Sequence, residues 1–357
     1  MKVAIIGAGI SGLSCAFEFK KHGIIPAVFE KKSRIGEDVN FVASTIKLYD
    51  TTFKDPLKHL KDEYNIELKP LNVLRQTVMY APNSKTIVNG TSGYIFSRGE
   101  HEQSLEYQMA SIADVPIIFN KHINIEEIRN EYDYVIDATG TLDMPKKLVM
   151  VTPYLNAYSR IAEINGSFDV SSVSVWFNTE YAKNCYCFLL PYSNKNACLI
   201  LTVNDISHSE LDFYWDKFLT MENMKDAVIW TSDVSHELGA IYPHKAGNIY
   251  FTGNSAAVIE STLGIGMFNC IETGNLAARS IIEKLDYEAQ TRHIFKYSRK
   301  MSELRKLLNT FDNEDYDRLI TLLGMPVIKQ LIYKNPFAKV IQGAVFIKAY
   351  NKLTGIK

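Results

Sequence analysis

The sequence has few cysteines and no long apolar run. Its five cysteines include no Cys-x-x-Cys pair. This odd number and open spacing favour a reducing compartment and argue against a zinc site or an iron–sulfur cluster, so we expect no metal. No stretch of about 18 apolar residues is present, and nothing in the sequence therefore predicts a membrane-spanning helix.

An excess of charge of either sign is also absent. The chain has 39 Lys and Arg against 40 Asp and Glu, a formal net charge of −1. Because the chain has no net positive charge, its composition does not predict binding to nucleic acid. The 46% apolar and 22% charged residues are typical of soluble globular proteins, and 357 residues allow two domains or one large fold with an inserted lobe.

A glycine-rich turn near the start of the chain has a clear chemical signature. Residues 3–6 are apolar, Gly7-x-Gly9-x-x-Gly12 follows, and residues 13–22 have helical periodicity. Gly7 allows a sharp turn, Gly9 allows a pyrophosphate to approach the backbone, and Gly12 allows the helix to pack on the strand. The pattern predicts a strand, a tight turn and a helix that bind a dinucleotide.

A second strand, residues 27–29, ends in Glu30, eighteen positions after Gly12. A carboxylate at this distance accepts hydrogen bonds from ribose hydroxyls, which supports the dinucleotide site. A strand at residue 3 leaves no room for a signal peptide, and we expect a cytoplasmic protein.

Two later segments have the pattern of strands that end on small residues. One ends at Ala138-Thr139-Gly140, where a ligand site and a plain turn are equally good interpretations. The other ends at Gly253-Asn254 and is followed by a helix from Gly266-Met267, whose positive end favours negative charge on a reduced flavin. No second Gly-x-Gly-x-x-Gly follows a strand, so we expect a single dinucleotide.

The C-terminal segment is helical in pattern and becomes basic. From Met325 onward there are six lysines and no acid, interleaved with apolar residues. Such a tail can contact an anionic membrane surface or admit a lipid, and a solvated helical cap is the alternative.

Together these features resemble the geranylgeranyl reductase family of FAD-dependent oxidoreductases, within the hydroxylase-like flavoprotein group. The likeness rests on the Gly7 to Gly12 turn with Glu30, a strand at 94–98 that enters a helix, and the two strand ends. Tyr186-Cys187-Phe188-Leu189-Leu190-Pro191 is similar to the family's YxWxFP motif, with Phe188 in place of the tryptophan and Leu190 in place of the phenylalanine.

The resemblance implies the residues of two sites. FAD contacts are expected at Gly7, Gly9, Ser11, Gly12, Glu30, Arg98, Asn254, Gly266 and Met267. Substrate contacts are expected at Tyr186, Phe188, Leu190 and Pro191. The family usually has Asp where this chain has Asn254, and a neutral amide accepts a ribityl hydroxyl more weakly. No catalytic residue is assigned, and Tyr186 and His244 are candidate proton donors.

The implied fold is α/β: a Rossmann-like FAD-binding domain, an antiparallel β-sheet substrate lobe and a C-terminal helical region. The expected division is 1–50, 91–150 and 246–285 for the FAD-binding domain, 51–90 and 151–245 for the lobe, and 286–357 for the helices.

The implied activity is hydride transfer from reduced flavin N5 to carbon–carbon double bonds of an isoprenoid or prenyl lipid. The partners would be a transient electron donor, either ferredoxin or a reduced nicotinamide or deazaflavin, and a membrane surface that the C-terminal tail contacts peripherally. Two alternatives stay open: an FAD monooxygenase of a small apolar or aromatic substrate, and an electron-transfer flavoprotein subunit.

Overall fold

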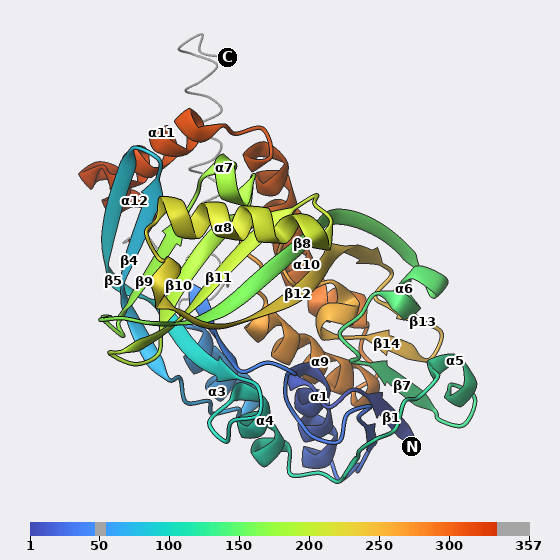
Figure 1. Ribbon diagram of the computed structural model, residues 1–357. Coiled ribbons are helices and arrows are strands. Elements are labelled where there is room, and N and C mark those ends of the chain that lie inside the picture. The colour runs from blue at the N-terminus through green and yellow to red at the C-terminus, as the bar shows by residue number, and fades with distance from the viewer. Residues whose placement is uncertain (47–54, 334–357) are drawn as a thin grey trace.

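The computed structural model describes residues 1–46 and 55–333. These residues form two β-sheets that lie beside each other, with helices packed on both, as Figure 1 shows. The mixed α/β fold that the sequence predicts is confirmed, with a Rossmann-like domain, a separate sheet lobe and C-terminal helices.

The smaller sheet has the order β13-β14-β7-β1-β2-β6, and β14, β7, β1, β2 and β6 are parallel to one another. Its strands are Val3–Ile6 (β1), Ala27–Phe29 (β2), Ile117–Ile118 (β6), Tyr134–Asp137 (β7), Lys245–Ala246 (β13) and Ile249–Phe251 (β14). Every residue of β1 is buried, as expected for a parallel strand that is covered on both faces.

Helix α1 (Ile10–Lys21) follows β1 directly and packs between α9 (Met267–Ile282) and α4 (Leu105–Ala113). Glycine is required where the strand turns into the helix. A Cβ on Gly12 would lie 2.0 Å from the Gly7 carbonyl oxygen, and one on Gly7 would lie 2.3 Å from the Ala138 carbonyl oxygen. These contacts confirm the strand, turn and helix that the glycine spacing predicts.

The larger sheet has the order β12-β8-β11-β10-β9-β4-β5-β3 and is antiparallel except between β4 and β9. Its strands are Phe41–Ile46 (β3), Asn72–Ala81 (β4), Ser84–Arg98 (β5), Met150–Asn165 (β8), Ser172–Trp176 (β9), Tyr186–Pro191 (β10), Asn196–Asn204 (β11) and Val228–Tyr242 (β12).

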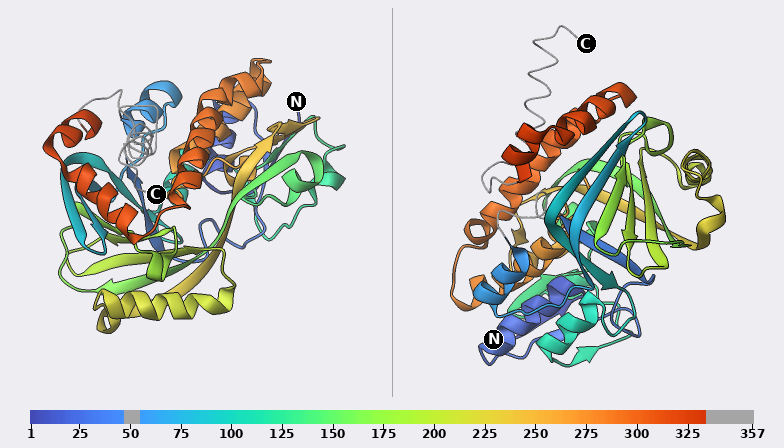
Figure 2. Two further views of the ribbon diagram at one scale, coloured as in Figure 1. Left: turned by 90° about the horizontal axis from the view of Figure 1, so that it is seen from above. Right: turned by 90° about the vertical axis from the view of Figure 1, so that its left-hand side faces the viewer.

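The two faces of this sheet have different coverings. Helix α8 (Leu211–Met221) packs across one face. The other face is turned toward α10 (Tyr287–Leu308), α11 (Asn313–Gly324) and α12 (Pro326–Tyr333), as the right-hand view of Figure 2 shows. The remaining helices are α3 (Pro56–Tyr64), α5 (Ile125–Ile128), α6 (Asp143–Leu148), α7 (Thr179–Ala182) and the short η1 (His208–Glu210), η2 (Lys225–Ala227) and η3 (Gly253–Ala256).

Two segments that are expected to belong to the FAD-binding domain contribute strands to the larger sheet. Strand β3 and the second half of β5 pair with each other in the larger sheet, and they lie within 1–50 and 91–150, the ranges that the sequence predicts for the FAD-binding domain. A Cβ on Gly93 of β5 would lie 1.7 Å from the Thr45 carbonyl oxygen, so the two strands pack too closely for any other residue. The pairing joins segments about fifty residues apart, and no local pattern reveals it.

The C-terminal region is helical from 287 to 333, as predicted, and the lysine-rich segment 334–357 lies outside the described residues. None of the helices within 1–46 and 55–333 is both long enough and apolar enough to cross a membrane.

A buried carboxylate ties three helices together. Glu272 of α9 accepts a hydrogen bond from the Tyr64 hydroxyl of α3 at 2.8 Å, and the Nε2 atoms of His59 and His293 lie 3.3 Å and 3.1 Å from its Oε1. Burial alone would raise the pKa of Glu272, but the hydrogen bonds from His293 and His59 outweigh it and lower the pKa to about 2. The hydrogen bond with Glu272 also raises the pKa of His293 above 6.5.

We expect Glu272→Gln to lose most stability between about pH 4.5 and 6.5. The lowered pKa of Glu272 contributes stability that is lost as pH falls from 4.5 toward 2. The raised pKa of His293 contributes stability that is complete below 6.5 and is lost as pH rises through the folded value. Within this window the loss should be about 3 kcal/mol, measured by urea unfolding across pH. Glu67→Gln, in an exposed pair with Lys61, is the matched control and should change stability by under about 1 kcal/mol. A loss that is constant from pH 3 to 8 would contradict this account.

Candidate cofactor site

Two helices begin at the same edge of the smaller sheet without a side-chain cap. The N-cap of α1 is Gly9 and that of α9 is Gly266, and neither forms a side-chain cap hydrogen bond. Strands β1, β7 and β14 are adjacent and parallel, so their carboxyl ends meet at this edge. The free N–H groups and positive dipole ends of both helices make the edge suitable for an anionic ligand.

The position beside Gly9 is open. A Cβ on Gly9 would meet no atom within 4 Å, in contrast to Gly7 and Gly12. The φ of Gly9 is −76°, which any residue can adopt, so neither packing nor backbone conformation requires glycine here. The open space is what a phosphate needs to approach the N–H groups of the first turn of α1.

Glu30 lies at the carboxyl end of β2, as its spacing predicts, and contacts the glycine turn. One carboxylate oxygen accepts from the Ala8 N–H at 2.9 Å and the other from the Lys32 N–H at 3.0 Å. A carboxylate has about four acceptor positions, so two remain for a sugar hydroxyl.

Arg98, at the end of β5, is held by two carboxylates of the protein. Its Nε donates to Glu106 of α4, and its Nη2 donates to Glu37 at 2.9 Å. Burial opposes the charged form, but Glu106 and Glu37 raise the pKa of the Arg98 guanidinium, which stays charged. A cofactor contact at Arg98 therefore stays a prediction, and any such contact would add to these two ion pairs.

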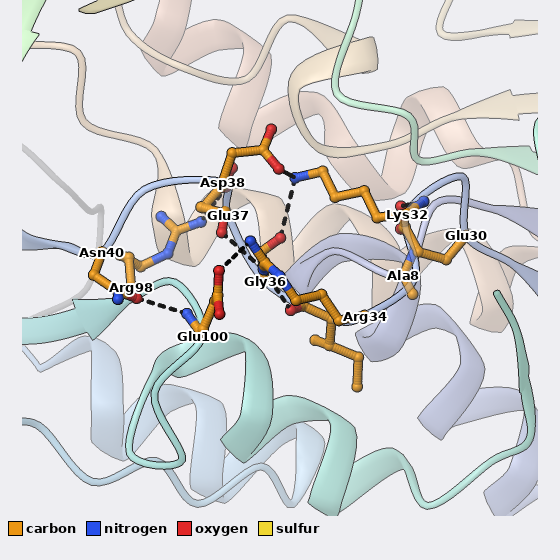
Figure 3. A network of polar contacts seen from close by, with 11 residues as sticks. Ala8, Glu30, Lys32, Arg34, Gly36, Glu37, Asp38, Asn40, Arg98 and Glu100 are labelled. Atoms are coloured by element: carbon orange, nitrogen blue, oxygen red, sulfur yellow. Dashed lines mark hydrogen bonds and ion pairs between the residues drawn. The ribbon is translucent and has the colours of Figure 1, made fainter. Parts of the chain in front are cut away.

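Further ion pairs hold the loop between Glu30 and β3 in place. Lys32 Nζ lies 3.0 Å from Asp38, and Arg34 Nη2 lies 2.5 Å from Glu100 beyond the end of β5. Figure 3 shows these side chains meeting in one network. A Cβ on Gly36 would lie 2.3 Å from the Gly99 carbonyl oxygen, so the two loops are in direct backbone contact.

Two buried polar atoms near the glycine turn lack a hydrogen-bond partner within the described part of the chain. They are Ser11 Oγ of α1 and Asp137 Oδ2 at the end of β7. Ser11 packs against Gly253 and Gly274, where added Cβ atoms would lie within about 3 Å of it. Burial raises the pKa of Asp137, whose other oxygen accepts from Thr139 and Ser255. Unpartnered buried oxygens at a strand edge fit a site that a polar ligand completes.

Asn254 is exposed directly after β14 and therefore lies at the same edge. Its Oδ1 is 3.4 Å from Cys270 Sγ in the first turns of α9. Met267, the first residue of that helix, is buried, and a Cβ on Gly266 would lie 2.9 Å from the Ile259 Cα. The structure thus brings Gly9, Ser11, Asn254 and Gly266 to one edge, and their contact with a cofactor stays a prediction.

The loop before α9 is organised by Glu260, which sequence reasoning did not single out. Its carboxylate accepts from the N–H groups of Thr262 at 2.6 Å, Leu263 at 2.7 Å and Ile265 at 3.2 Å. Burial raises the pKa of Glu260 despite these bonds. The only local signal is a single acid within an otherwise uncharged stretch before a helix.

The predicted substrate residues lie on the larger sheet beside this loop. Tyr186, Phe188 and Leu190 alternate along β10 and share one buried face, which also packs on Leu263 and Ile265. The Tyr186 hydroxyl lies 2.8 Å from the position of a Cβ on Gly264, so it contacts the loop backbone. Pro191, the last residue of β10, is buried and accepts from Asn72 through its carbonyl oxygen.

The second candidate proton donor, His244, has a different environment. Its Nδ1 is 2.6 Å from Glu288 of α10, and its ring is stacked on Phe295 at 3.4 Å between centroids. It precedes the edge strand β13 of the smaller sheet. These partners fit a packing role, whereas Tyr186 contacts the loop that leads into α9.

Comparison with known proteins agrees with this fold. Residues 5–61 match the family model of the NAD(P)-binding Rossmann-like domain. A digeranylgeranylglycerophospholipid reductase 2 of Methanosphaera stadtmanae is 23% identical over 96% of this chain and 99% of its own. The resemblance to geranylgeranyl reductases is confirmed. It extends over nearly the whole length of both chains.

Solved structures share the fold of these reductases. A geranylgeranyl bacteriochlorophyll reductase-like protein of Thermoplasma acidophilum has a TM-score of 0.72 at 15% identity and is matched over 97% of this chain and 98% of its own. The flavin-dependent brominase Bmp2 has a TM-score of 0.68 at 11% identity, over 98% and 99%. The fold is therefore that of the flavin-dependent oxidoreductases, which include reductases and halogenases.

Proposed function

We propose that the chain is an FAD-dependent reductase of carbon–carbon double bonds in an isoprenoid or prenyl lipid. The observation that carries the proposal is the meeting of Tyr186 with the Gly264 backbone. This contact joins the reductase-like motif of the larger sheet to the loop before α9. That loop lies beside the edge of the smaller sheet at which we propose that the cofactor binds.

The residues at this edge fit FAD, as the space at Gly9, the two uncapped helices and the unpartnered Ser11 hydroxyl indicate. In this proposal Gly9 and the first turn of α1 bind the pyrophosphate, and Glu30 binds the adenosine ribose. Ser11, Arg98 and Asn254 contact the middle of the cofactor, and Gly266 and Met267 face the flavin ring. FAD supplies a hydride when it is bound and reduced.

The substrate side is apolar, which suits an isoprenoid chain. The face of the larger sheet that bears Tyr186 includes the buried side chains of Leu74, Ile161, Val173, Val175, Phe188, Leu190 and Cys198. An isolated alkene presents little charge to stabilise, so the protein contributes mainly by holding the double bond and excluding water.

Two partners belong to the proposal. A transient electron donor, either ferredoxin or a reduced nicotinamide or deazaflavin, would reduce the flavin. A basic C-terminal tail beyond residue 333 would contact an anionic membrane surface peripherally, since the segment has lysines and no acid.

Anaerobic incubation of the dithionite-reduced, FAD-loaded protein with geranylgeranyl lipids tests the activity. Mass spectrometry should show products heavier by two hydrogens for each reduced bond. A control without protein should show none. No gain with any prenyl lipid would overturn the proposal. Oxygen-dependent hydroxylation would point instead to a monooxygenase, and flavin reduction only in the presence of a stable partner would point to an electron-transfer subunit.

A further inference from the structure

A polar stripe crosses the apolar face of the larger sheet. It consists of Tyr186 on β10, Thr202 on β11, Ser159 on β8 and His236 on β12. Tyr186 pairs with Thr202, and Thr202 pairs with Ser159, so three of the four residues lie directly opposite one another on adjacent strands. On one side of the stripe the next residues along β10, β11 and β8, which are Phe188, Ile200 and Ile161, are apolar.

Three members of the stripe, His236, Ser159 and Thr202, are linked by hydrogen bonds. His236 Nε2 lies 2.9 Å from Ser159 Oγ, and Ser159 Oγ lies 2.8 Å from Thr202 Oγ1. Thr202 is the direct cross-strand neighbour of Tyr186, and its side chain lowers the pKa of Tyr186, which burial raises. Each hydroxyl can donate to one neighbour and accept from the other, which is the requirement for passing a proton along a chain.

The two ends of the stripe differ in their access to solvent. Tyr186, Thr202 and Ser159 are each less than 8% exposed. His236 is half-buried between Ser235 and Glu237, which are both exposed. At the inner end the Tyr186 hydroxyl contacts Gly264, an exposed residue of the loop that leads into α9. The stripe therefore connects the protein surface with the proposed site of reduction.

We propose that Tyr186 donates the proton that completes alkene reduction and that Thr202, Ser159 and His236 replace it from solvent. This inference rests on the proposed function. In the reaction, one alkene carbon takes the hydride that FAD supplies, and the other takes the phenolic proton. The phenolate then takes a proton from Thr202, Thr202 from Ser159, and Ser159 from His236 Nε2–H, while Nδ1 of the same ring takes a proton from solvent, so that the imidazole stays neutral. Each double bond therefore gains one hydride and one proton.

The charged and titratable groups that face Tyr186 keep the phenol in its donor form. Burial raises the pKa of Tyr186 well above 10, and Cys185 and Glu260 act in the same direction, against Arg305. The phenol is therefore protonated at neutral pH. Burial lowers the pKa of His236, so its ring is neutral and can take up and release a proton from solvent.

The hydrogen-bonded chain can be tested without turnover. In the FAD-loaded protein labelled with 15N-histidine, the His236 signals are assigned by their loss in His236→Gln. Tyr186→Phe should shift the His236 Nε2 signal in the wild-type background. The same change should have no effect in a Thr202→Val background, because valine breaks the chain. A shift of equal size in both backgrounds, or in neither, would overturn the relay whatever the activity.

The rate of alkene reduction tests whether the hydrogen-bonded chain takes part in the reaction. Thr202→Val should lower the rate of alkene reduction about a hundredfold, with KM for the lipid unchanged. Thr202→Ser should restore most of the rate, and Ser235→Ala, an exposed hydroxyl on the other face of β12, should leave it unchanged.

Each further outcome is decisive. A raised KM with an unchanged kcat in Thr202→Val would mean that the stripe binds substrate, and would overturn the relay. If NMR shows that the hydrogen-bonded chain is intact but the wild-type protein reduces no prenyl lipid, the proposed function is overturned instead.

Discussion

Gly9→Asp is expected to weaken FAD binding about a hundredfold or more, equivalent to about 3 kcal/mol, without destabilising the apoprotein. The new carboxylate would fill the space that is open at Gly9 and place negative charge where we propose that the pyrophosphate binds. The backbone at Gly9 is extended, and Asp is among the preferred N-cap residues, so helix α1 should form at least as well. Isothermal titration with FAD and urea unfolding of the apoprotein measure the two effects.

Two further glycine variants distinguish binding from folding. Gly9→Ala adds one methyl group without charge and should reduce affinity much less than Gly9→Asp. Gly12→Ala should destabilise the apoprotein itself, because its Cβ would lie 2.0 Å from the Gly7 carbonyl oxygen. If Gly9→Asp bound FAD as tightly as the wild type, the cofactor would not lie at the start of α1.

Glu260→Ala is expected to lower the stability of the protein by about 3 kcal/mol or more. Three backbone N–H groups of the loop before α9 would lose their acceptor in a buried environment, and each such loss costs about 1–3 kcal/mol. The loop would also release Gly264 from its contact with Tyr186. Urea unfolding measures the stability, and visible circular dichroism of the bound flavin detects a change in the conformation of the loop.

Glu260→Gln is the matched control. Its one amide oxygen can replace the Oε1 that accepts from Leu263 and Ile265, so only the bond from Thr262 is lost. The loss of stability should be about half of that in Glu260→Ala. Equal losses in both variants would show that the carboxylate charge matters, and not the acceptor geometry.

The sequence predicts the first β–α unit and strand β10 well, for a local reason. The positions of Gly7 and Gly12 are fixed by backbone contacts within one turn, and the alternation of Tyr186, Phe188 and Leu190 shows directly in the chain order. Residues near each other in sequence determine both features.

The features that the sequence does not reveal all depend on contacts between distant segments. The pairing of β3 with β5 is set by the close approach at Gly93, and Glu260 matters only because the loop around it is buried. The carboxylates that hold Arg98 come from a loop about sixty residues earlier and from the following helix. The polar stripe is visible only when four strands are aligned, since Ser159 and His236 are far apart in the chain.

The spectrum of the anaerobically reduced, FAD-loaded protein on addition of a prenyl lipid tests the central claim most directly. The account predicts that the oxidised flavin spectrum returns in the absence of oxygen, with one double bond lost from the lipid for each flavin. A flavin that stays reduced with every prenyl lipid, and is reoxidised only when oxygen is admitted, would contradict it.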